Sequence, residues 1–375
     1  MKAADQFELD ASSRSTSAGS IFLLFLGIGL RAFGGPAAQI AELRAEFVDR
    51  RRWLAAERFH RALAVYQLLP GPEAHELCCY LGALRGGRLG SVAAGLGFML
   101  PGLVLMLGVC AIYAKLDFAA PSLACAMAAM QLGAAALIVR AAWRLGKPVV
   151  ASGPLHAIVL LLSLMLALWW FTPTRDATTP LVAEVARGSI AISTLFGHGL
   201  AAGLVTFGGA YTAIPYITEI STGANGWMTR EEILNGVAIA SVLPAPLVIF
   251  CTFAGFLGAG FAGALASTAG IFLPAFSFTL VGFSSIERLL AWKSARTVLD
   301  FAGAIAIGLM AGAALPIALE PLRSGSGQAV PLGLATPVVF LVLLLAVFRS
   351  KSRLAVPVLI VTAGALGALY GFLAH

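Results

Sequence analysis

The chain has 375 residues, of which 59% are hydrophobic and only 11% are charged, and its formal net charge is +7. Soluble domains carry roughly 25% charged residues, so this composition excludes a soluble enzyme or binding domain and predicts a membrane protein. The five cysteines lie in apolar sequence without metal-ligand spacing, and we interpret them as small buried residues.

The chain opens with a polar tail of mixed charge, residues 1–19. This tail lacks a cationic start and a small-residue cleavage site, so we expect it to be retained rather than removed as a signal peptide. The oily segment that follows, residues 20–33, is shorter than the roughly 20 residues that a spanning helix needs. It stops at the sequence Phe-Gly-Gly-Pro, and the next apolar segment, residues 59–69, stops at Pro-Gly-Pro. Both segments are predicted to be broken or re-entrant helices.

Longer segments without Asp, Glu, Lys or Arg follow, and each is near or above the length of a membrane span. Only helices and closed barrels satisfy backbone polar groups in lipid, and these uniformly apolar runs favour helices. The sequence therefore predicts an all-α polytopic membrane protein. The windows are residues 91–114, 118–139, 149–174, 301–319, 329–348 and 354–375.

The sequence contains an internal duplication. Adding 174 to a residue number in the first half reaches a matching residue in the second half, and after one deletion the offset becomes 173. We therefore predict two homologous repeats, residues 20–171 and 190–375, joined by a polar linker at residues 172–189. The matched positions include Phe33 with Phe207, Gly34 with Gly208, Gly35 with Gly209, Trp53 with Trp227, Pro70 with Pro244, Pro72 with Pro246 and Pro101 with Pro274.

The positive charges are placed differently in the two halves, and Lys and Arg concentrate in cytoplasmic loops. Loops that are basic in the first half have acidic or uncharged counterparts in the second, where other loops are basic instead. We therefore predict an inverted repeat, an arrangement that recurs in transporters with a site between the repeats. The basic segments are 42–61, 84–90, 140–147, 287–296 and 349–353, whereas 216–234 is acidic and 258–264 carries no charge.

The breaks themselves suggest a chemistry. Non-helical backbone at membrane depth persists only inside protein or beside a watery cavity. Pro36 and Pro72 can each occupy a first helical position, after which free amides and the helix dipole favour an anion. The simpler alternative is that these prolines only kink packed helices. We expect the four breaks, FGGP, PGP, FGG and PAP, to converge on a small anion near the midplane.

Several side chains near the breaks are candidates for this site. Arg31 lies in an apolar run, where it either pairs with an oxyanion or snorkels to the interface. Glu73 either caps a helix or, with His75 and Glu76 close by, couples proton and anion binding. Neutral hydrogen-bond donors could complete the site or simply pack in the core. These donors are Tyr66, Gln67 and Tyr211.

A basic stretch, Arg50 to Arg52 followed by Trp53, is interpreted as an interfacial anchor that could also attract anions. Phosphate-cradling loops, dinucleotide fingerprints and paired metal-binding histidines are not found in the sequence. We therefore predict that the protein is not an enzyme, needs no cofactor, binds no nucleic acid and draws on ion gradients. Its expected partners are a small inorganic oxyanion and the lipid bilayer, and a homodimer is compatible with the sequence.

Five motifs resemble the chromate ion transporter (CHR) family, in its long two-domain form. They are FGGPAAQI (33–40), RRRWL (50–54), LLPGPEAHEL (68–77), VTFGGAYTAIPYI (205–217) and GWMTREEIL (226–234). The resemblance implies chromate export across a bacterial inner membrane, driven by the membrane potential or a proton gradient. Alanine at position 245 departs from the Pro-Gly-Pro that the second repeat often carries, which puts anion binding by that half in doubt.

Only the resemblance names chromate. Sulfate has the same charge and shape, so a transporter for sulfate or another small oxyanion is the alternative, and a membrane sensor or scaffold that transports nothing is a second one. The predicted substrate-binding residues are Arg31, Phe33, Gly34, Gly35, Pro36, Gln67, Pro70, Gly71, Pro72, Glu73, Phe207, Gly208, Gly209, Tyr211, Pro244 and Pro246.

Overall fold

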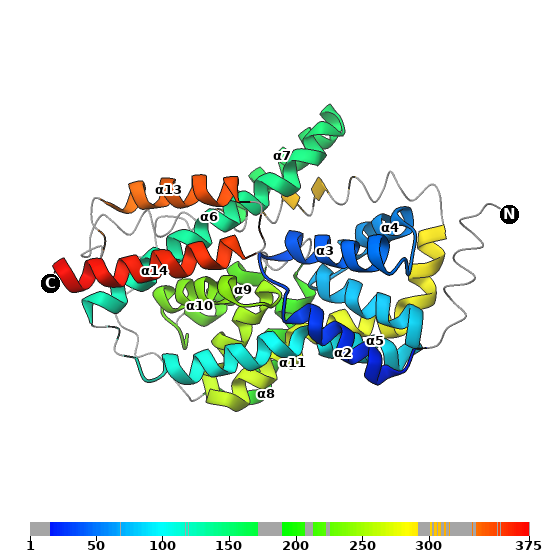
Figure 1. Ribbon diagram of the computed structural model, residues 1–375, viewed down its shortest axis with the longest axis horizontal. Coiled ribbons are helices and arrows are strands. Elements are labelled where there is room, and N and C mark those ends of the chain that lie inside the picture. Colours follow the sequence, from blue (N-terminus) through cyan, green and yellow to red (C-terminus); the bar gives the residue numbers. More distant parts are fainter. Residues whose placement is uncertain are drawn as a thin grey trace.

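A computed structural model gives the fold (Figure 1). It describes residues 16–67, 69–116, 118, 120–171, 190–206, 213–222, 226–291, 335–350, 352 and 354–374, together with scattered positions between 301 and 332. Within these ranges all regular secondary structure is helical, which confirms the all-α prediction. The predicted linker lies outside the described residues, as do Phe207, Gly208, Gly209 and Tyr211.

Four described helices are long and apolar enough to cross a membrane. Each contains a stretch of 18 residues with high mean hydropathy and at most two charged residues. Shorter apolar helices accompany them. The protein is therefore a multi-pass membrane protein. The four long segments are Glu73–Tyr113, Pro121–Ala151, Leu247–Arg288 and Ala355–Leu373.

The first repeat begins with two interrupted helix pairs. Helix α2 (Ala18–Gly29) is followed by a break and by α3 (Pro36–Arg44), which continues into a π-helical turn, η1 (Ala45–Arg50). Helix α4 (Ala56–Tyr66) is followed by the second break and by α5 (Glu73–Tyr113). Both short helices thus stop three or four residues before the ends of the predicted segments, 33 and 69.

Helix α5 reverses direction at Gly86 and Gly87, where the backbone leaves the helical region and Gly87 has a φ of 58°. The two limbs then pack against each other. A Cβ atom on Gly82 would lie 2.3 Å from the carbonyl oxygen of Gly90, so only glycine permits this approach. The limb 73–85 therefore forms a hairpin with α4 on one side and with the long limb 88–113 on the other.

The second repeat reproduces this arrangement. Its elements are α8 (Ile192–Leu204), α9 (Ala213–Thr222), α10 (Arg230–Val242), the 3-10 turn η3 (Leu247–Ile249) and α11 (Phe250–Ala291). Helix α11 reverses at Ala259 and Gly260 with nearly the same backbone angles as α5. The predicted duplication is therefore confirmed in the fold.

Close helix contacts also recur at equivalent positions. In each repeat the first helix packs along the long limb, and glycines let the two backbones approach closely. A Cβ on Gly29 would lie 2.5 Å from the Phe98 carbonyl oxygen, and a Cβ on the equivalent Gly203 would lie 2.6 Å from the Ile271 carbonyl oxygen. The second equivalent pair is Gly97 and Gly270. A Cβ on these residues would lie 2.5 Å from the Phe22 carbonyl oxygen and 2.4 Å from the Phe196 carbonyl oxygen.

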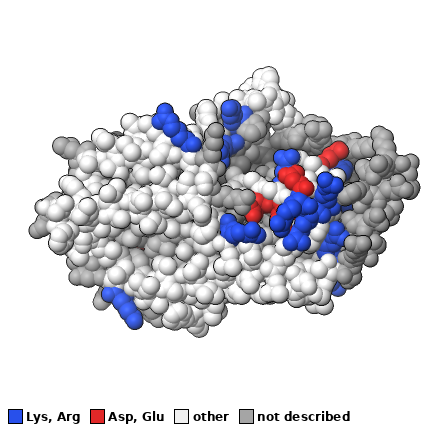
Figure 2. All heavy atoms as spheres, viewed as in Figure 1, with Lys and Arg blue, Asp and Glu red and all other residues white. Residues whose placement is uncertain are grey.

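The short helices of the two repeats lie toward opposite ends of the molecule, whereas the long limbs of α5 and α11 each extend to the end of the other repeat. In Figure 1, α2, α3 and α4 lie on one side of the middle, and α8, α9 and α10 lie on the other. On the face shown in Figure 2, charged side chains gather over the end formed by the first repeat, whereas the opposite end is mostly uncharged. An inverted repeat predicts such a one-sided gathering of charge.

The remaining described helices form a side layer. Helix α14 (Ala355–Ala374) packs antiparallel on α6 (Pro121–Ala151), with Gly133 against Ile360 and Gly371 against Pro121. Helices α7 (Pro154–Phe171) and α13 (Thr336–Arg349) also lie against α6. The predicted span at 301–319 is described only at scattered positions.

Each repeat is also tied at its outer end to the long limb of the other. Arg58 of α4 forms an ion pair with Glu287 of α11 (2.9 Å), and the Tyr80 hydroxyl of α5 donates to the same carboxylate (2.8 Å). At the opposite end, Asn235 of α10 donates to the Tyr113 hydroxyl of α5 (3.1 Å). One end is thus held by charge and the other by neutral hydrogen bonds.

We predict that Asp49→Cys and Arg230→Cys are labelled from opposite sides of the membrane. Both side chains are exposed, and they lie at opposite ends of the inverted repeat. The assay is reaction with a membrane-impermeant maleimide in intact cells and in inverted vesicles. The wild-type chain is the background control because its cysteines are all buried. Labelling of both variants from one side would contradict the inverted arrangement.

We also predict that Gly97→Ala lowers the thermal stability of the detergent-solubilised protein, whereas Gly108→Ala does not. A Cβ at position 97 would lie 2.5 Å from a backbone oxygen of α2, but none at position 108 would meet an atom within 4 Å. Overpacking costs roughly 1–3 kcal/mol, whereas glycine to alanine in an open helix position gains up to about 1 kcal/mol. Equal melting temperatures for the two variants would argue against the tight α2–α5 packing.

Candidate functional site

Described residues at or beside the predicted breaks of one repeat contact those of the other in two places. The Gly71 amide donates a hydrogen bond to the Thr206 carbonyl (2.8 Å), which joins the second break of the first repeat to the residue before the FGG trio. The Gln39 side-chain amide donates to the Ala245 carbonyl (2.8 Å) and to the Ala32 carbonyl (2.9 Å). The breaks thus satisfy part of one another's backbone polarity inside the protein.

The first break exposes a helix start. Gly34 and Gly35 have φ values of 90° and 79°, a left-handed region that favours glycine. They turn the chain so that α3 begins directly at Pro36, as predicted, and no side chain caps that helix start. The N-terminal end of α3 therefore keeps its partial positive charge next to the cross-repeat contact of Gln39.

The second break leads into α5. Gly71 has a φ of 149°, and a Cβ there would lie 2.8 Å from the Glu76 carboxylate oxygen Oε1. Pro72 is the N-cap rather than the first helical residue, so the prediction for this proline is wrong by one position, because α5 begins at Glu73. No side-chain hydrogen bond caps this helix start either.

The first turn of α5 holds a group of buried polar side chains. Glu73 is 1% exposed, and His75 and Glu76 are fully buried. Among the described residues, no hydrogen-bond partner meets either carboxylate or the Nε2 atom of His75, whose ring packs against Phe272 and Phe276 at 4.8 Å. Burying polar atoms without partners is costly, so this group has capacity for a proton, water or ligand.

Gln39 adds one more unused acceptor. Its side chain is 1% exposed, and its Oε1 atom has no hydrogen-bond partner in the described part of the protein. Gln39 lies within the motif FGGPAAQI but was not among the predicted substrate-binding residues. A signal was present, because Gln39 is a polar residue in the first turn after a proline break.

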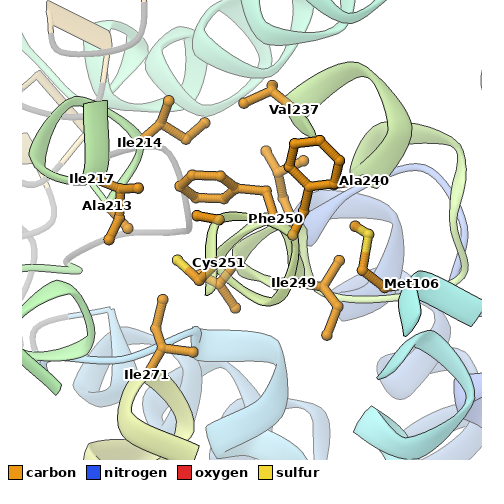
Figure 3. Close-up of a cluster of buried hydrophobic side chains, with 14 of the residues drawn as sticks. Met106, Ala213, Ile214, Ile217, Val237, Ala240, Ile249, Phe250, Cys251 and Ile271 are labelled. Atoms are coloured by element: carbon orange, nitrogen blue, oxygen red, sulfur yellow. The ribbon is translucent and has the colours of Figure 1, made fainter. Parts of the chain in front are cut away.

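The second repeat has no such polar group at the equivalent place. Leu247, Ile249 and Phe250 stand where the first repeat has Glu73, His75 and Glu76. They belong to a large apolar cluster, part of which is shown in Figure 3, that also contains Met106 and Ile214. The polar group is therefore one-sided, although the scaffold around it is duplicated.

Ala245 and Gly71 face complementary partners across the repeats. Gly71 lies against Ala275, whereas Ala245 lies so close to Gly102 that a Cβ at position 102 would lie 2.2 Å from the alanine Cβ. Positions 102 and 275 are themselves equivalent in the duplication. A glycine thus meets an alanine in both places. The alanine that replaces glycine at position 245 faces a glycine at position 102, where the equivalent position 275 has alanine.

The other predicted residues lie in different surroundings. Arg31 is exposed at the end of α2, where its Nε atom donates to the Gly27 carbonyl (2.9 Å). Phe33, Gln67 and Pro70 are half-buried, whereas Pro244 and Pro246 are buried beside the contact of Gln39 with Ala245. The Tyr66 hydroxyl pairs with Thr279 (3.1 Å), which fits a packing role.

The basic stretch lies on the surface and is partly neutralised. Glu46 accepts hydrogen bonds from both Arg50 and Arg51 at 2.5 Å. Burial raises the pKa of Glu46, but the hydrogen bonds and charges of the two arginines outweigh it and leave the pKa below its usual value. Trp53 packs against Phe47 (4.6 Å) and under the Arg85 guanidinium (5.0 Å), consistent with an anchor.

Several known proteins match this chain over most of its length. A family model described as chromate transporter matches residues 19–190 and again 193–368. A "Chromate transport protein" of Pseudomonas aeruginosa is 38% identical over 92% of this chain and 91% of its own length. A "Chromate transport protein" of Cupriavidus metallidurans is 25% identical over 80% of this chain and 82% of its own length.

A "Probable chromate transport protein" of Synechococcus elongatus is 26% identical over 92% of this chain and 94% of its own length. No solved structure matches the chain. Because the family model covers both repeats, the duplicated helices, the crossing breaks and the polar first turn of α5 all lie within the matched regions. The chain belongs to the chromate transporter family.

Proposed function

We propose that this protein is a secondary transporter that exports chromate from the cytoplasm across a bacterial inner membrane. Family membership and the names of the relatives support chromate as the substrate. The observation that carries the proposal is the buried, unpartnered polar group at the place where breaks of both repeats cross. Inverted-repeat transporters bind their substrates at such a place.

The anion would be held mainly by backbone. The starts of α3 and α5 lack side-chain caps, and each helix start carries about half a positive charge. Gly35 and Gly71, which precede these helices, allow a ligand to approach the backbone closely. The second repeat would supply the apolar wall and the cross-repeat contacts that hold the breaks in place.

The carboxyl groups of Glu73 and Glu76 suggest how export is driven. They lie on one turn of α5, next to the amides that would bind the anion, and two buried like charges there would repel each other and the substrate. A proton on this pair would remove that repulsion, so proton and oxyanion occupancy would be linked. This favours a contribution of the proton gradient beside the membrane potential.

A sensor or scaffold is the less supported reading. Neither role calls for unpartnered carboxylates in the interior, where each destabilises the fold unless function retains it. Sulfate remains an alternative substrate by charge and shape. The transport assay separates these readings because it measures each oxyanion directly.

We predict that the purified protein in liposomes accumulates labelled chromate when a membrane potential or a pH gradient is imposed. The expected result is uptake well above that of empty liposomes, abolished by a protonophore together with potassium and valinomycin. Sulfate is tested in parallel under the same gradients. Absence of chromate flux under every gradient would overturn the proposed function.

We predict that Glu76→Gln and Glu73→Gln each lower the chromate transport rate by at least about tenfold and flatten its dependence on pH. A factor of ten corresponds to about 1.4 kcal/mol, the scale of one lost charge-dependent interaction. Glu57→Gln is the matched control, because Glu57 is an exposed acid in the first turn of α4. Normal rates and an unchanged pH profile in both site variants would exclude coupling through this pair.

A further inference from the structure

We infer that Arg58 and Tyr80 form an entry site for a small tetrahedral oxyanion, such as chromate or sulfate, and that the Glu287 carboxylate occupies this site until a substrate displaces it. The inference rests on the proposed transport function and adds a binding step outside the buried polar group. It depends on the geometry of these three side chains and on the contacts between α4, α5 and α11 that lead from them to Glu76.

The three side chains are arranged as in a site that binds an oxyanion. The Nη2 atom of Arg58 donates to Oε2 of Glu287 (2.9 Å), and the Tyr80 hydroxyl donates to Oε1 of the same carboxylate (2.8 Å). The Nε atom of Arg58 also donates to the Tyr80 hydroxyl oxygen (3.1 Å), which holds the two donors side by side. A guanidinium and a hydroxyl thus bind both oxygens of one anion, and two oxygens of a tetrahedral oxyanion could take their place.

The exposure of the ion pair allows such an exchange. The side chains of Arg58 and Glu287 are 21% and 30% exposed, so water reaches both of them. Ion pairs that water reaches contribute little to stability, so an oxyanion from solution can compete with the carboxylate. Tyr80 is fully buried behind the pair and stays in place while Glu287 moves into water.

The charges around the pair favour an incoming anion. Within one turn of it, α4 carries the exposed Glu57 and Arg61, and α11 carries the exposed Arg288. Together with the pair itself, three arginines stand against two acids, so this end of the molecule keeps a positive charge. Glu76, one turn inward on α5, belongs to the pair of carboxyl groups that the proposed function protonates.

A line of polar groups leads inward from the entry site. On α5, Tyr80 follows Glu76 by one turn, about 6 Å along the axis, and lies on the same face. On α4, the Tyr66 ring packs against that of Tyr80 (5.9 Å), and its hydroxyl pairs with Thr279 of α11 (3.1 Å). Hydroxyl groups therefore lie between the ion pair and the buried carboxyl groups.

Helix α11 lines the same path with one of its faces. Four of its residues, spaced three or four apart, contact successive groups of α4 and α5. Because α11 belongs to the second repeat and α4 and α5 belong to the first, release of Glu287 would unfasten the repeats from each other at this end. The four contacts are Phe276 with His75 (4.8 Å), Thr279 with Tyr66 (3.1 Å), Phe283 with Tyr80 (5.8 Å) and Glu287 with Arg58 (2.9 Å).

The described residues at the opposite end form no equivalent anion site. There Asn235 donates to the Tyr113 hydroxyl (3.1 Å) and accepts from Gln131 (2.8 Å), and all three side chains are neutral. The residue equivalent to Arg58 is Glu232, which caps the start of its own helix. Capture of an oxyanion at the basic end alone, which the charge distribution predicts to be cytoplasmic, favours export.

The test measures the KM for labelled chromate and labelled sulfate in inverted membrane vesicles, which expose the cytoplasmic face. Glu287→Gln removes the competing charge, so the KM should fall about two- to fivefold. Arg58→Gln removes the guanidinium, so the KM should rise at least about tenfold. An ion pair that only supports the fold predicts instead that both variants shift the KM in the same direction, or not at all.

Glu57→Gln and Arg61→Gln are the matched controls, because they make the same changes of charge at exposed positions of α4. Both should leave the KM unchanged. Arg58→Lys replaces Arg58→Gln if the latter does not fold, and it should also raise the KM because lysine lacks the planar fork of donors. An unchanged or raised KM in Glu287→Gln overturns the inference, whatever the arginine variants do.

Binding without transport separates this inference from the proposed function. Absence of uptake by wild-type vesicles under every gradient would defeat the transport function. In that case the melting temperature of the purified protein, titrated with sulfate at constant ionic strength, still reports binding. Glu287→Gln should need about two- to fivefold less sulfate than the wild type for the same rise, and an equal requirement would overturn the inference.

Discussion

Backbone polar groups that leave a helix inside a membrane need partners within the protein, because lipid supplies none. In this fold the breaks of one repeat find part of those partners in the other, through the bond from Gly71 to Thr206 and through Gln39 to Ala245. Neither repeat could complete these contacts alone. Residues that follow α2, α4, α8 and α10 all take part in that exchange, and the candidate site lies beside it.

The duplicated scaffold has been used for two different purposes. Equivalent glycines hold the helices together in both halves, and both long helices reverse at equivalent positions. After the proline breaks, however, one repeat carries Glu73, His75 and Glu76, and the other carries an apolar core. We propose that the first repeat binds the oxyanion and couples its transport to protons, while the second repeat holds the breaks of the first in place. Two similar halves would then form a single site.

Much of this arrangement could be predicted from the sequence. The constant offset between Gly, Pro and Trp positions predicted the duplication. The proline motifs indicated that α2 and α4 are short helices that stop near these motifs. The reversals at Gly87 and Gly260 were not predicted, because charge-free windows show only that a segment is apolar. Gln39 was missed because its importance comes from Ala245, which lies 206 residues away in sequence. Such a contact follows from how the repeats pack rather than from local pattern.

The most direct test of the account is a structure of the full chain determined by electron cryo-microscopy in the presence of chromate. The account predicts density for the oxyanion between the first turns of α3 and α5, within hydrogen-bonding distance of Gln39 and Glu76. Density confined to the arginine surface around Arg50 and Arg51, with an unoccupied and dry crossing of the breaks, would contradict it.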